Sequence, residues 1–407
     1  MISLHELTER IETKREEIER WFEEKRSLHP RPIYGSVDVR DAGWKIGVVD
    51  ANHFPAGFNN IDEKDQPHLS GLLKNHILRQ HPECTWVHLF PESHTRNPAY
   101  VENIRSIQLL IENAGFHCTV GSPELNDLGF LNGIEGPLKL AMVEMDEGDE
   151  AMYVNGAEPC LILLNNDLTD QILPPISKQQ ITPSVEMGWH RRKKSEHYEC
   201  LEPLVQEVAE ILEIDAWQLL PQWFVSENKC LDEDTCKTKL AHDINEFLSS
   251  IQEKYDRLGI KRKPMAIIKN DSGTYGLGLL VLESGDQILH LSNRKLNKLR
   301  YAKGGSTVEN FLIQEGIPTI LRLDENTPVE PVGYLVDGDA ASWFYRANSK
   351  KNEIDNLNSP SAQFLSSYDV PEHLTKHANT WHTLVAELSM VAMGIELQRQ
   401  SNVEGEL

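Results

Sequence analysis

The chain has 407 residues, 40% of them hydrophobic and 25% charged, a composition typical of a globular protein with two or three domains. Its formal net charge is −23, from 63 acidic and 40 basic residues, which argues against nucleic acid as a partner. No apolar run approaches the ~20 residues that a helix needs to cross a membrane, so we expect no membrane association.

The cysteines are scattered and include no CxxC pair. This spacing argues against a zinc site and against a disulfide framework. The first residues are charged, unlike a secretory signal. We therefore expect a cytoplasmic protein with reduced thiols at Cys84, Cys118, Cys160, Cys200, Cys230 and Cys236.

The first half of the sequence predicts an α/β fold. Residues 3–27 form an amphipathic pattern that predicts one helix, with Ser3 and Glu6 as a capping box. From residue 34 to about 165, apolar strands alternate with helical stretches, which predicts a largely parallel sheet. The strands expected are 44–52, 85–92, 117–122 and 160–167, and the helices are 68–80 and 98–116.

Polar residues follow three of these strands. A single cluster of this kind is an ordinary turn, since Asn and Asp are turn formers. Three clusters at equivalent positions favour a polar ligand site, because α/β folds bind ligands at the carboxyl ends of their strands. The substrate-site candidates are Asp50, Asn52, Asn59 and Asn60 after the first strand and Arg96 and Asn97 after the second, while Asn165, Asn166 and Asp167 follow the strand at 160–167.

A Pro-rich connector at 171–187 leads into the basic run GWHRRKKSEHY at 188–198. Arg191 and Arg192 in this run are candidates for holding substrate carboxylates or phosphates, and a solvated basic loop is the alternative. A long helix is expected over 232–260, capped near Gly259, and another over 371–400. The predicted domains are 1–187, a helical connecting region at 188–260, and 261–407.

The stretch from 263 to 360 predicts a nucleotide clamp. Lys269 ends an apolar strand, and a glycine loop then leads into a second strand. P-loops and Rossmann loops open a helix instead, so strand, loop and strand predict a hairpin flap that closes over phosphates. A plain glycine hairpin is the alternative. The nucleotide-binding candidates in this loop, besides Lys269, are Ser272, Gly273, Tyr275, Gly276 and Gly278.

The strand FLIQE and the turn after it suit an adenine hinge, with a simple turn as the alternative. The hinge candidates are Gln314, Glu315, Gly316 and Ile317. Asp337-Gly338 predicts the tight turn of a hairpin whose second strand carries Arg346. The charge and forked geometry of arginine suit a phosphoryl group in transfer, and a surface arginine is the alternative.

The segment NEIDNLNSP offers oxygen ligands for Mg²⁺ at Glu353, Asn356 and Asn358. The alternative for this segment is a plain Asn-Ser-Pro loop.

Taken together, these strings resemble the ATP-grasp superfamily and, more closely, the bacterial glutamate–cysteine ligase family built on that fold. The resemblance covers most of the chain and is carried by 49–60, 90–100, 162–168, 188–198, 267–282, 314–319, EPVGYLVDG, WFYRAN and 356–364. It implies an N-terminal parallel α/β domain like the one that precedes ATP-grasp folds, followed by an ATP-grasp α+β domain.

The resemblance further implies an ATP- and Mg²⁺-dependent ligase that joins the γ-carboxylate of L-glutamate to the amine of L-cysteine. The reaction would pass through an acyl phosphate and begin glutathione biosynthesis, with Lys269, Mg²⁺ and Arg346 neutralising charge. Asn356 stands where glutathione synthetase has a glutamate, so the metal ligands depart from that pattern. The alternatives are another carboxylate–amine ligase and a non-catalytic ATP-binding module.

Overall fold

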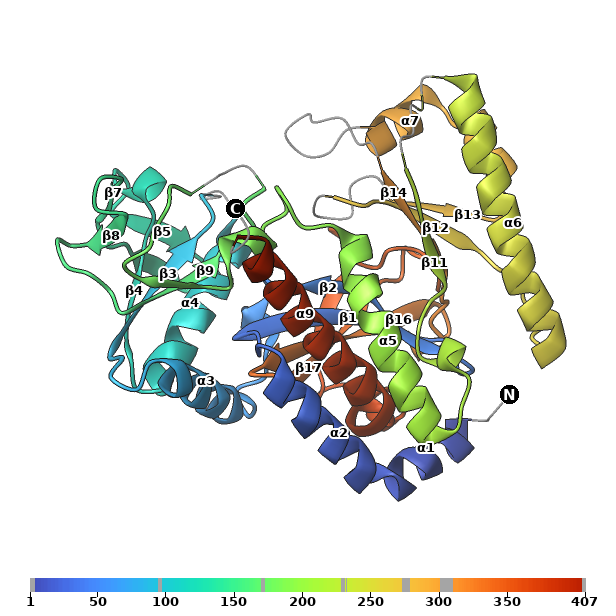
Figure 1. The fold of residues 1–407 in the computed structure, drawn as a ribbon, viewed down its shortest axis with the longest axis horizontal. Coiled ribbons are helices and arrows are strands. Elements are labelled where there is room, and N and C mark those ends of the chain that lie inside the picture. The colour runs from blue at the N-terminus through green and yellow to red at the C-terminus, as the bar shows by residue number, and fades with distance from the viewer. Residues whose placement is uncertain are drawn as a thin grey trace.

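The computed structural model describes residues 4–93, 97–169, 173–227, 231, 233–272, 279–300 and 310–404. Three groups of elements lie side by side in Figure 1, with a mixed sheet-and-helix unit on each side of a central antiparallel sheet. Within the described residues, no helix is long and apolar enough to cross a membrane.

The central sheet has the order β18-β17-β16-β1-β2, and β15 pairs with β16 outside this path. Its register places Tyr34 opposite Val336, so strands from the two ends of the chain are neighbours. Their bounds are β1 (Tyr34–Asp41), β2 (Ile46–Asn52), β15 (Arg322–Asp324), β16 (Thr327–Val336), β17 (Asp339–Ala347) and β18 (Gln363–Ser366).

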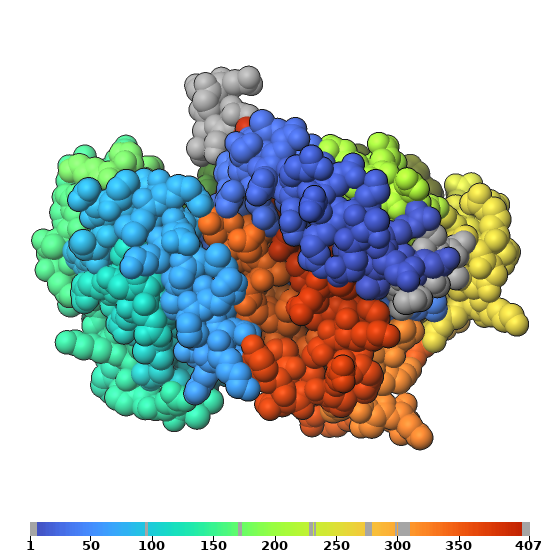
Figure 2. All heavy atoms as spheres, turned by 90° about the horizontal axis from the view of Figure 1, so that it is seen from below, coloured from blue at the N-terminus to red at the C-terminus, as the bar shows by residue number. Residues whose placement is uncertain are grey.

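Alternate residues of the central strands face opposite sides, as the pleat requires. Val37, Val39 and Leu335 join the largest apolar core together with helices from both ends of the chain. Figure 2 shows the blue N-terminal residues lying directly against the red C-terminal ones. The helices on this side are α1 (Leu4–Thr13), α2 (Arg15–Leu28), α5 (Lys194–Leu212) and α9 (Thr383–Glu404).

The second sheet is parallel throughout, in the order β10-β9-β3-β4. The prediction of an α/β fold with a parallel sheet in the first half is therefore confirmed, and Gly115 ends a helix with φ 99° as expected. The elements are α3 (Gln66–Gln80), β3 (Trp86–Pro91), α4 (Pro98–Asn113), β4 (His117–Val120), β9 (Leu161–Asn165) and β10 (Gln180–Thr182), with the hairpins β5 (Phe130–Gly133)–β6 (Gly136–Lys139) and β7 (Val143–Asp146)–β8 (Ala151–Val154).

The third sheet has the order β11-β14-β12-β13 and packs on the long helix α6. Strand β12 pairs antiparallel with β13, which confirms the two predicted strands on either side of the glycine loop. Gly259 ends α6 with φ 71°, also as predicted. The elements are β11 (Trp223–Ser226), α6 (Asp234–Leu258), β12 (Ala266–Asn270), β13 (Leu280–Leu282), α7 (Asn293–Arg300) and β14 (Phe311–Glu315).

Three expectations about the elements were wrong. The strand at 46–52 pairs with β1 in the antiparallel central sheet and not in the parallel sheet. The first helix is divided at Lys14 into α1 and α2. The last helix is divided into α8 (Glu372–Thr375), a π-helical turn (Ala378–His382) and α9. The central sheet also joins strands of the predicted first and third domains.

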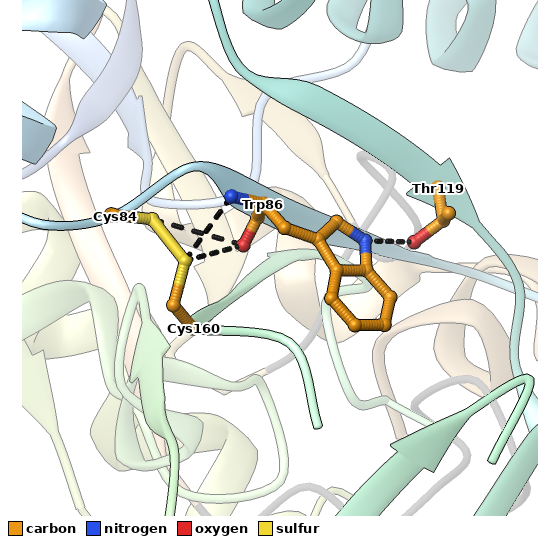
Figure 3. The surroundings of a disulfide bond; sticks show 4 residues. All are labelled: Cys84, Trp86, Thr119 and Cys160. Atoms are coloured by element: carbon orange, nitrogen blue, oxygen red, sulfur yellow. Dashed lines mark hydrogen bonds between the residues drawn. A yellow bond between two sulfur atoms is a disulfide. The ribbon is translucent and has the colours of Figure 1, made fainter. Parts of the chain in front are cut away.

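The expectation that all cysteines are reduced was also wrong, because Cys84 and Cys160 form a disulfide (Figure 3). Their Cα atoms are 5.8 Å apart. The two residues come just before β3 and β9, and these parallel strands are neighbours that pair Val87 with Leu161. A separation of 76 residues in sequence conceals this proximity, which only the sheet order creates.

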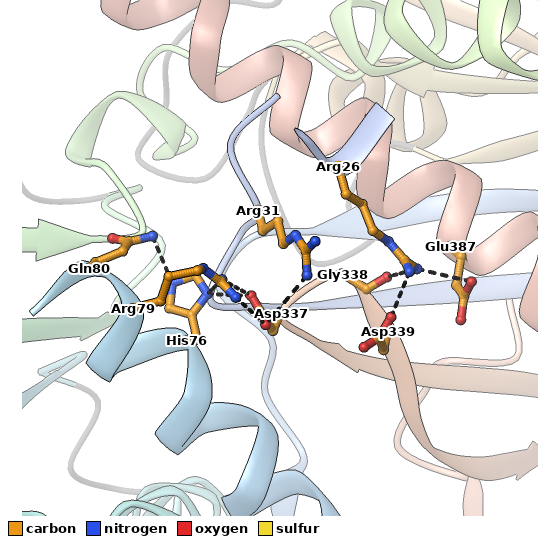
Figure 4. A network of polar contacts seen from close by, with 9 residues as sticks. All are labelled: Arg26, Arg31, His76, Arg79, Gln80, Asp337, Gly338, Asp339 and Glu387. Carbon is orange, nitrogen blue, oxygen red and sulfur yellow. Dashed lines mark hydrogen bonds and ion pairs between the residues drawn. The ribbon is translucent and has the colours of Figure 1, made fainter. Parts of the chain in front are cut away.

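A polar network joins α3 to the turn between β16 and β17 (Figure 4). Asp337 occupies the predicted tight turn with φ 57°. Its carboxylate lies 2.8 Å from His76 Nδ1 and accepts a hydrogen bond of 2.9 Å from Arg79 Nη1. Burial raises the pKa of Asp337, but these hydrogen bonds outweigh burial and lower it to about 2. The turn residue therefore also connects the parallel unit to the central sheet.

Candidate active site

A cavity of about 230 Å³ lies between the polar face of the central sheet and the third sheet. Residues of all three sheets line it, including Glu92 and Asp167 at the ends of β3 and β9. Of the predicted site residues, those that line it are Asp50, Asn52, Lys269, Gln314, Glu315, Ile317, Arg346, Asn356 and Asn358.

Lys269 reaches into this cavity from β12, opposite Leu312 of β14. Its Nζ donates a hydrogen bond of 2.6 Å to the carbonyl oxygen of Val49. Burial lowers the pKa of Lys269, while attraction from Asp50 and Asp38 works against this shift. A partly buried cation of this kind attracts an anion that enters the cavity more strongly than a surface lysine does.

The predicted hinge segment, Gln314–Ile317, is held in place by contacts of Glu315 and Gly316. The buried Glu315 carboxylate pairs with Lys45 and accepts a hydrogen bond of 3.1 Å from Trp217 Nε1. The Glu315 and Gly316 amides donate to Gln222 and Met265 carbonyl oxygens at 2.7 and 2.8 Å. These contacts give the Glu315 side chain a structural role, and an adenine hinge at Gln314–Ile317 stays a prediction.

Gly316 lies too close to neighbouring atoms to carry a side chain. A Cβ at this position would lie 2.9 Å from Ile354 Cδ1 and 3.1 Å from the Met265 carbonyl oxygen. Ile354 lines the cavity, so only a glycine lets the hinge and the cavity wall come this close.

Arg346 lines the cavity from β17 between two carboxylates that the sequence analysis missed. Its Nη1 lies 2.8 Å from Asp38 Oδ2 and 2.6 Å from Glu330 Oε1. Arg40 Nε pairs with the second oxygen of Glu330 at 2.7 Å. Burial raises the pKa of Asp38 to about 6, Arg346 works against this rise, and the carboxylates of Glu330 and Asp50 add to it. Alternation along β1 and β16 would have revealed Asp38 and Glu330 had the two strands been placed side by side.

The predicted metal ligands separate into two sets. Asn356 and Asn358 line the cavity. The Glu353 carboxylate does not, because it pairs with Arg322 and, at 2.5 Å, with Arg262. Within the described residues, no group of three His, Cys, Asp or Glu side chains has metal-binding geometry. The oxygen donors that remain suit Mg²⁺ in kind, since Asp38 and Glu330 supply carboxylates beside the two amides.

The remaining predicted site residues that the structure describes lie outside the cavity lining. Asn59 and Asn60 belong to a short 3₁₀ turn (Phe58–Asn60), and Asn97 caps α4 by accepting a hydrogen bond of 3.2 Å from the Ala99 amide. Ser272 is exposed, and its amide donates to Asn270 Oδ1 at 3.0 Å. Arg96, Gly273, Tyr275, Gly276 and Gly278 fall outside the described residues.

The basic run at 188–198 contributes residues other than those predicted. Arg191 is exposed and pairs with Glu186. Arg192 is buried, with its Nε 2.7 Å from Glu396 and its Nη1 donating to the Ala51 carbonyl oxygen at 2.8 Å. The cavity is lined instead by Trp189 and Lys194.

Lys194 has a distinct electrostatic environment. Its Nζ lies 3.7 Å from the centre of the Trp189 ring. Burial lowers the pKa of Lys194 to about 8, although attraction from Asp50 opposes the shift. A cation and a carboxylate thus face one cavity from α5 and β2.

A cavity that gathers cations, amides and carboxylates from three sheets suits a charged small molecule. Comparison with known proteins specifies the class of protein as a ligase. The profile of the glutamate-cysteine ligase family matches residues 8–397, and the chain belongs to that family.

A solved structure agrees with this assignment. It is a Methylobacillus flagellatus KT protein provisionally named gamma-glutamylcysteine synthetase, 29% identical, with a TM-score of 0.87 over 97% of this chain and 96% of that one. D-alanyl-alanine synthetase A of Vibrio cholerae O1 shares 11% identity over 74% of this chain and 80% of its own, and its TM-score of 0.35 is too low to carry an argument. No curated protein matches the sequence.

Proposed function

We propose that this protein uses ATP to join the γ-carboxylate of L-glutamate to the amine of L-cysteine through a γ-glutamyl phosphate. The observation that carries the proposal is the cavity, where Lys269, the hinge at Gln314–Ile317 and Arg346 meet Asp50 and Asn52. Family membership supports the overall reaction, and the phosphorylated intermediate is our inference from the arrangement of charges.

The chemistry requires positioning and charge neutralisation more than covalent help from the protein. A γ-carboxylate oxygen of glutamate attacks the γ-phosphorus of ATP, and ADP leaves. The cysteine amine then attacks the acyl carbon and expels phosphate. Lys269 and Arg346 would neutralise the charge that moves between the oxygens.

Asn356, Asn358, Glu330 and Asp38 would hold Mg²⁺, which supplies charge neutralisation on the phosphate oxygens when it is bound. The raised pKa of Asp38 fits this role, because it reflects burial together with neighbouring carboxylates whose repulsion a divalent cation would relieve. The glycine loop that follows Lys269 would exclude water, which otherwise hydrolyses an acyl phosphate.

Two measurements test the proposal on the purified protein with Mg²⁺. ADP release should depend on both amino acids, and mass spectrometry should identify γ-glutamylcysteine. With glutamate carrying ¹⁸O in its γ-carboxylate, one ¹⁸O should appear in the phosphate released. Product without ¹⁸O in phosphate would rule out the acyl phosphate, and ADP release with a different amino-acid pair would favour another carboxylate–amine ligase.

Lys269→Ala should lower kcat about 10²- to 10³-fold, as expected for the loss of one charge-stabilising group. Lys269 is preferable to Arg346 for this test because its amine donates to a backbone carbonyl, whereas removal of Arg346 would take away the ion-pair partner of Asp38 and one of the two partners of Glu330. Lys263→Ala, at an exposed lysine of the same segment, is the matched control and should retain wild-type turnover. A Lys269→Ala protein with full turnover would contradict the role assigned to Lys269.

A further inference from the structure

Asp50 is a carboxylate in the cavity to which the described residues of the central sheet supply no cation. It lies on β2 opposite Asp38 of β1, and the carboxylate of Asp38 is taken up by Arg346. The Asp50 side chain accepts one hydrogen bond, of 3.3 Å, from Asn52 Nδ2. Among the residues that the structure describes, Asp50 has no ion-pair partner within 4.0 Å, although it lines the cavity. A cationic group of a ligand could therefore pair with the Asp50 carboxylate.

Lys194 faces the same cavity and is held in place from two sides. Its own amide donates to the Asp271 carbonyl oxygen at 2.8 Å. The amide and hydroxyl of Ser195 both donate to the Asp271 carboxylate at 2.8 Å, which fixes the first turn of α5 at the end of β12. The Trp189 ring lies against the Lys194 ammonium. This cation is therefore preorganised and not a mobile surface lysine.

The two charges act on each other and on Lys269. Asp50 exerts the strongest attraction on Lys194 among the surrounding charged groups, and it does the same for Lys269. A ligand with an ammonium and a carboxylate on one carbon matches a carboxylate next to an ammonium, because each charge of the ligand meets its opposite. The α-carbon of an amino acid is such a ligand.

The chemistry of the proposed function, on which this inference rests, decides which amino acid it is. The cysteine amine must lose its proton to attack, so an amine held as an ammonium against Asp50 could not react. The α-ammonium of glutamate takes no part in the reaction. We propose that Asp50 and Lys194 bind the α-ammonium and α-carboxylate of glutamate, which leaves the γ-carboxylate to approach Lys269.

The test uses two glutamate analogues, each lacking one α-substituent, as competitors of glutamate in the ADP-release assay. Glutarate lacks the ammonium, and 4-aminobutyrate lacks the α-carboxylate. Asp50→Asn and Lys194→Gln should each raise the KM for glutamate about ten- to a hundred-fold, the size expected for one charge-assisted contact. The KM values for cysteine and ATP should change less than about three-fold in both variants.

The analogues then separate the two charges. Asp50→Asn should bring the inhibition constant of glutarate close to the KM for glutamate, without doing so for 4-aminobutyrate. Lys194→Gln should do the reverse, and Lys194→Arg should restore most of the affinity for glutamate. Lys193→Gln, at the exposed neighbour, is the matched control and should change none of these values. Circular dichroism checks that each variant is folded.

An unchanged glutamate KM in folded variants, or a rise in the cysteine KM alone, would overturn the assignment. Calorimetric titration of glutamate into wild type and variants keeps this inference separable from the proposed function. A wild-type protein that binds glutamate, releases no ADP and loses binding on Asp50→Asn would refute the function and support the subsite. Equal glutamate binding by wild type and both variants would refute the subsite, whatever the activity.

Discussion

Glu396 shows how strongly a single residue of α9 supports the wall of the cavity. It is buried, with Arg192 Nε at 2.7 Å and His197 Nδ1 at 2.5 Å from its carboxylate. Arg192 in turn donates to the Ala51 carbonyl oxygen, between Asp50 and Asn52. Burial raises the pKa of Glu396, but attraction from Arg192 and the contacts with His197 and His53 outweigh burial and hold the pKa well below its usual range. The glutamate is therefore ionised and structurally required.

Glu396→Gln should lower the free energy of unfolding by about 3 kcal/mol, because it leaves Arg192 buried without its counter-charge. The measurement is urea unfolding with the m-value checked for constancy. Glu199→Gln is the control, since Glu199 pairs with Arg399 at 3.6 Å with both side chains about half exposed. Similar losses in the two variants would contradict the importance given to burial here.

At the scale of single residues, the sequence predicts the kinds of groups in the site better than their identity. The run at 188–198 indicates cations near a ligand, but the course of the turn before α5, which begins at Lys194, decides which of them face the cavity. Glu353 is a plausible metal ligand by sequence, but in the structure its carboxylate pairs with Arg262 and Arg322, which belong to distant segments. Neither fact is encoded in local spacing.

Helix α9 packs so closely on the segment before β1 that one of its positions admits no side chain. A Cβ on Gly394 would lie 2.1 Å from the Pro30 carbonyl oxygen. Gly71 in α3 is also helical, but it is exposed and a Cβ there would meet nothing within 4 Å. Substitution by alanine should therefore have opposite effects on stability at the two glycines.

Gly394→Ala should destabilise the protein by about 1–3 kcal/mol, the cost of overpacking against a backbone atom. Gly71→Ala should instead stabilise it by up to about 1 kcal/mol, because alanine favours an exposed helix interior. Thermal melts of the two variants beside wild type decide the matter. A shift of the same sign in both would contradict the packing described for α9.

At the scale of elements, periodicity predicted most helices and strands but not their partners. The strand at 46–52 was recognised from its apolar residues. Its assignment to the parallel sheet was wrong because its neighbour β1 pairs with β16, roughly 300 residues further along the chain. Local pattern determines that a segment is extended, while the choice of sheet depends on contacts between remote segments.

For the whole molecule, the Asp337 network makes the contact between α3 and the central sheet sensitive to acid. The pKa of Asp337 is lowered to about 2, below the ~3.9 of an unfolded aspartate. A lowered carboxyl pKa contributes stability that is present above pH ~4 and is lost as the pH falls toward 2.

Asp337→Asn keeps a residue that tolerates positive φ and removes the charge. It should therefore destabilise the protein at pH 7, and the difference from wild type should shrink steadily between pH 4 and pH 2 as the wild-type carboxyl is protonated. Unfolding by urea at a series of pH values measures this. Asp369→Asn, at an exposed carboxylate, is the control. A difference that stays constant with pH would show that the network does not depend on the charge.

The position of β1 and β2 in the central sheet also has a consequence for biosynthesis. Both strands leave the ribosome early, but β16, the partner that separates β1 from β17, is translated roughly 300 residues later. At about 5–20 residues per second, this interval lasts some tens of seconds. During that time β1 exposes an unpaired edge whose residues are nearly all buried in the folded protein, the kind of edge that chaperones cover and that promotes aggregation when they do not. The parallel unit, whose four strands all lie between residues 86 and 182, can complete its sheet meanwhile. The nascent chain thus passes through a state in which the parallel unit is complete and the central sheet that lines the cavity has not yet formed.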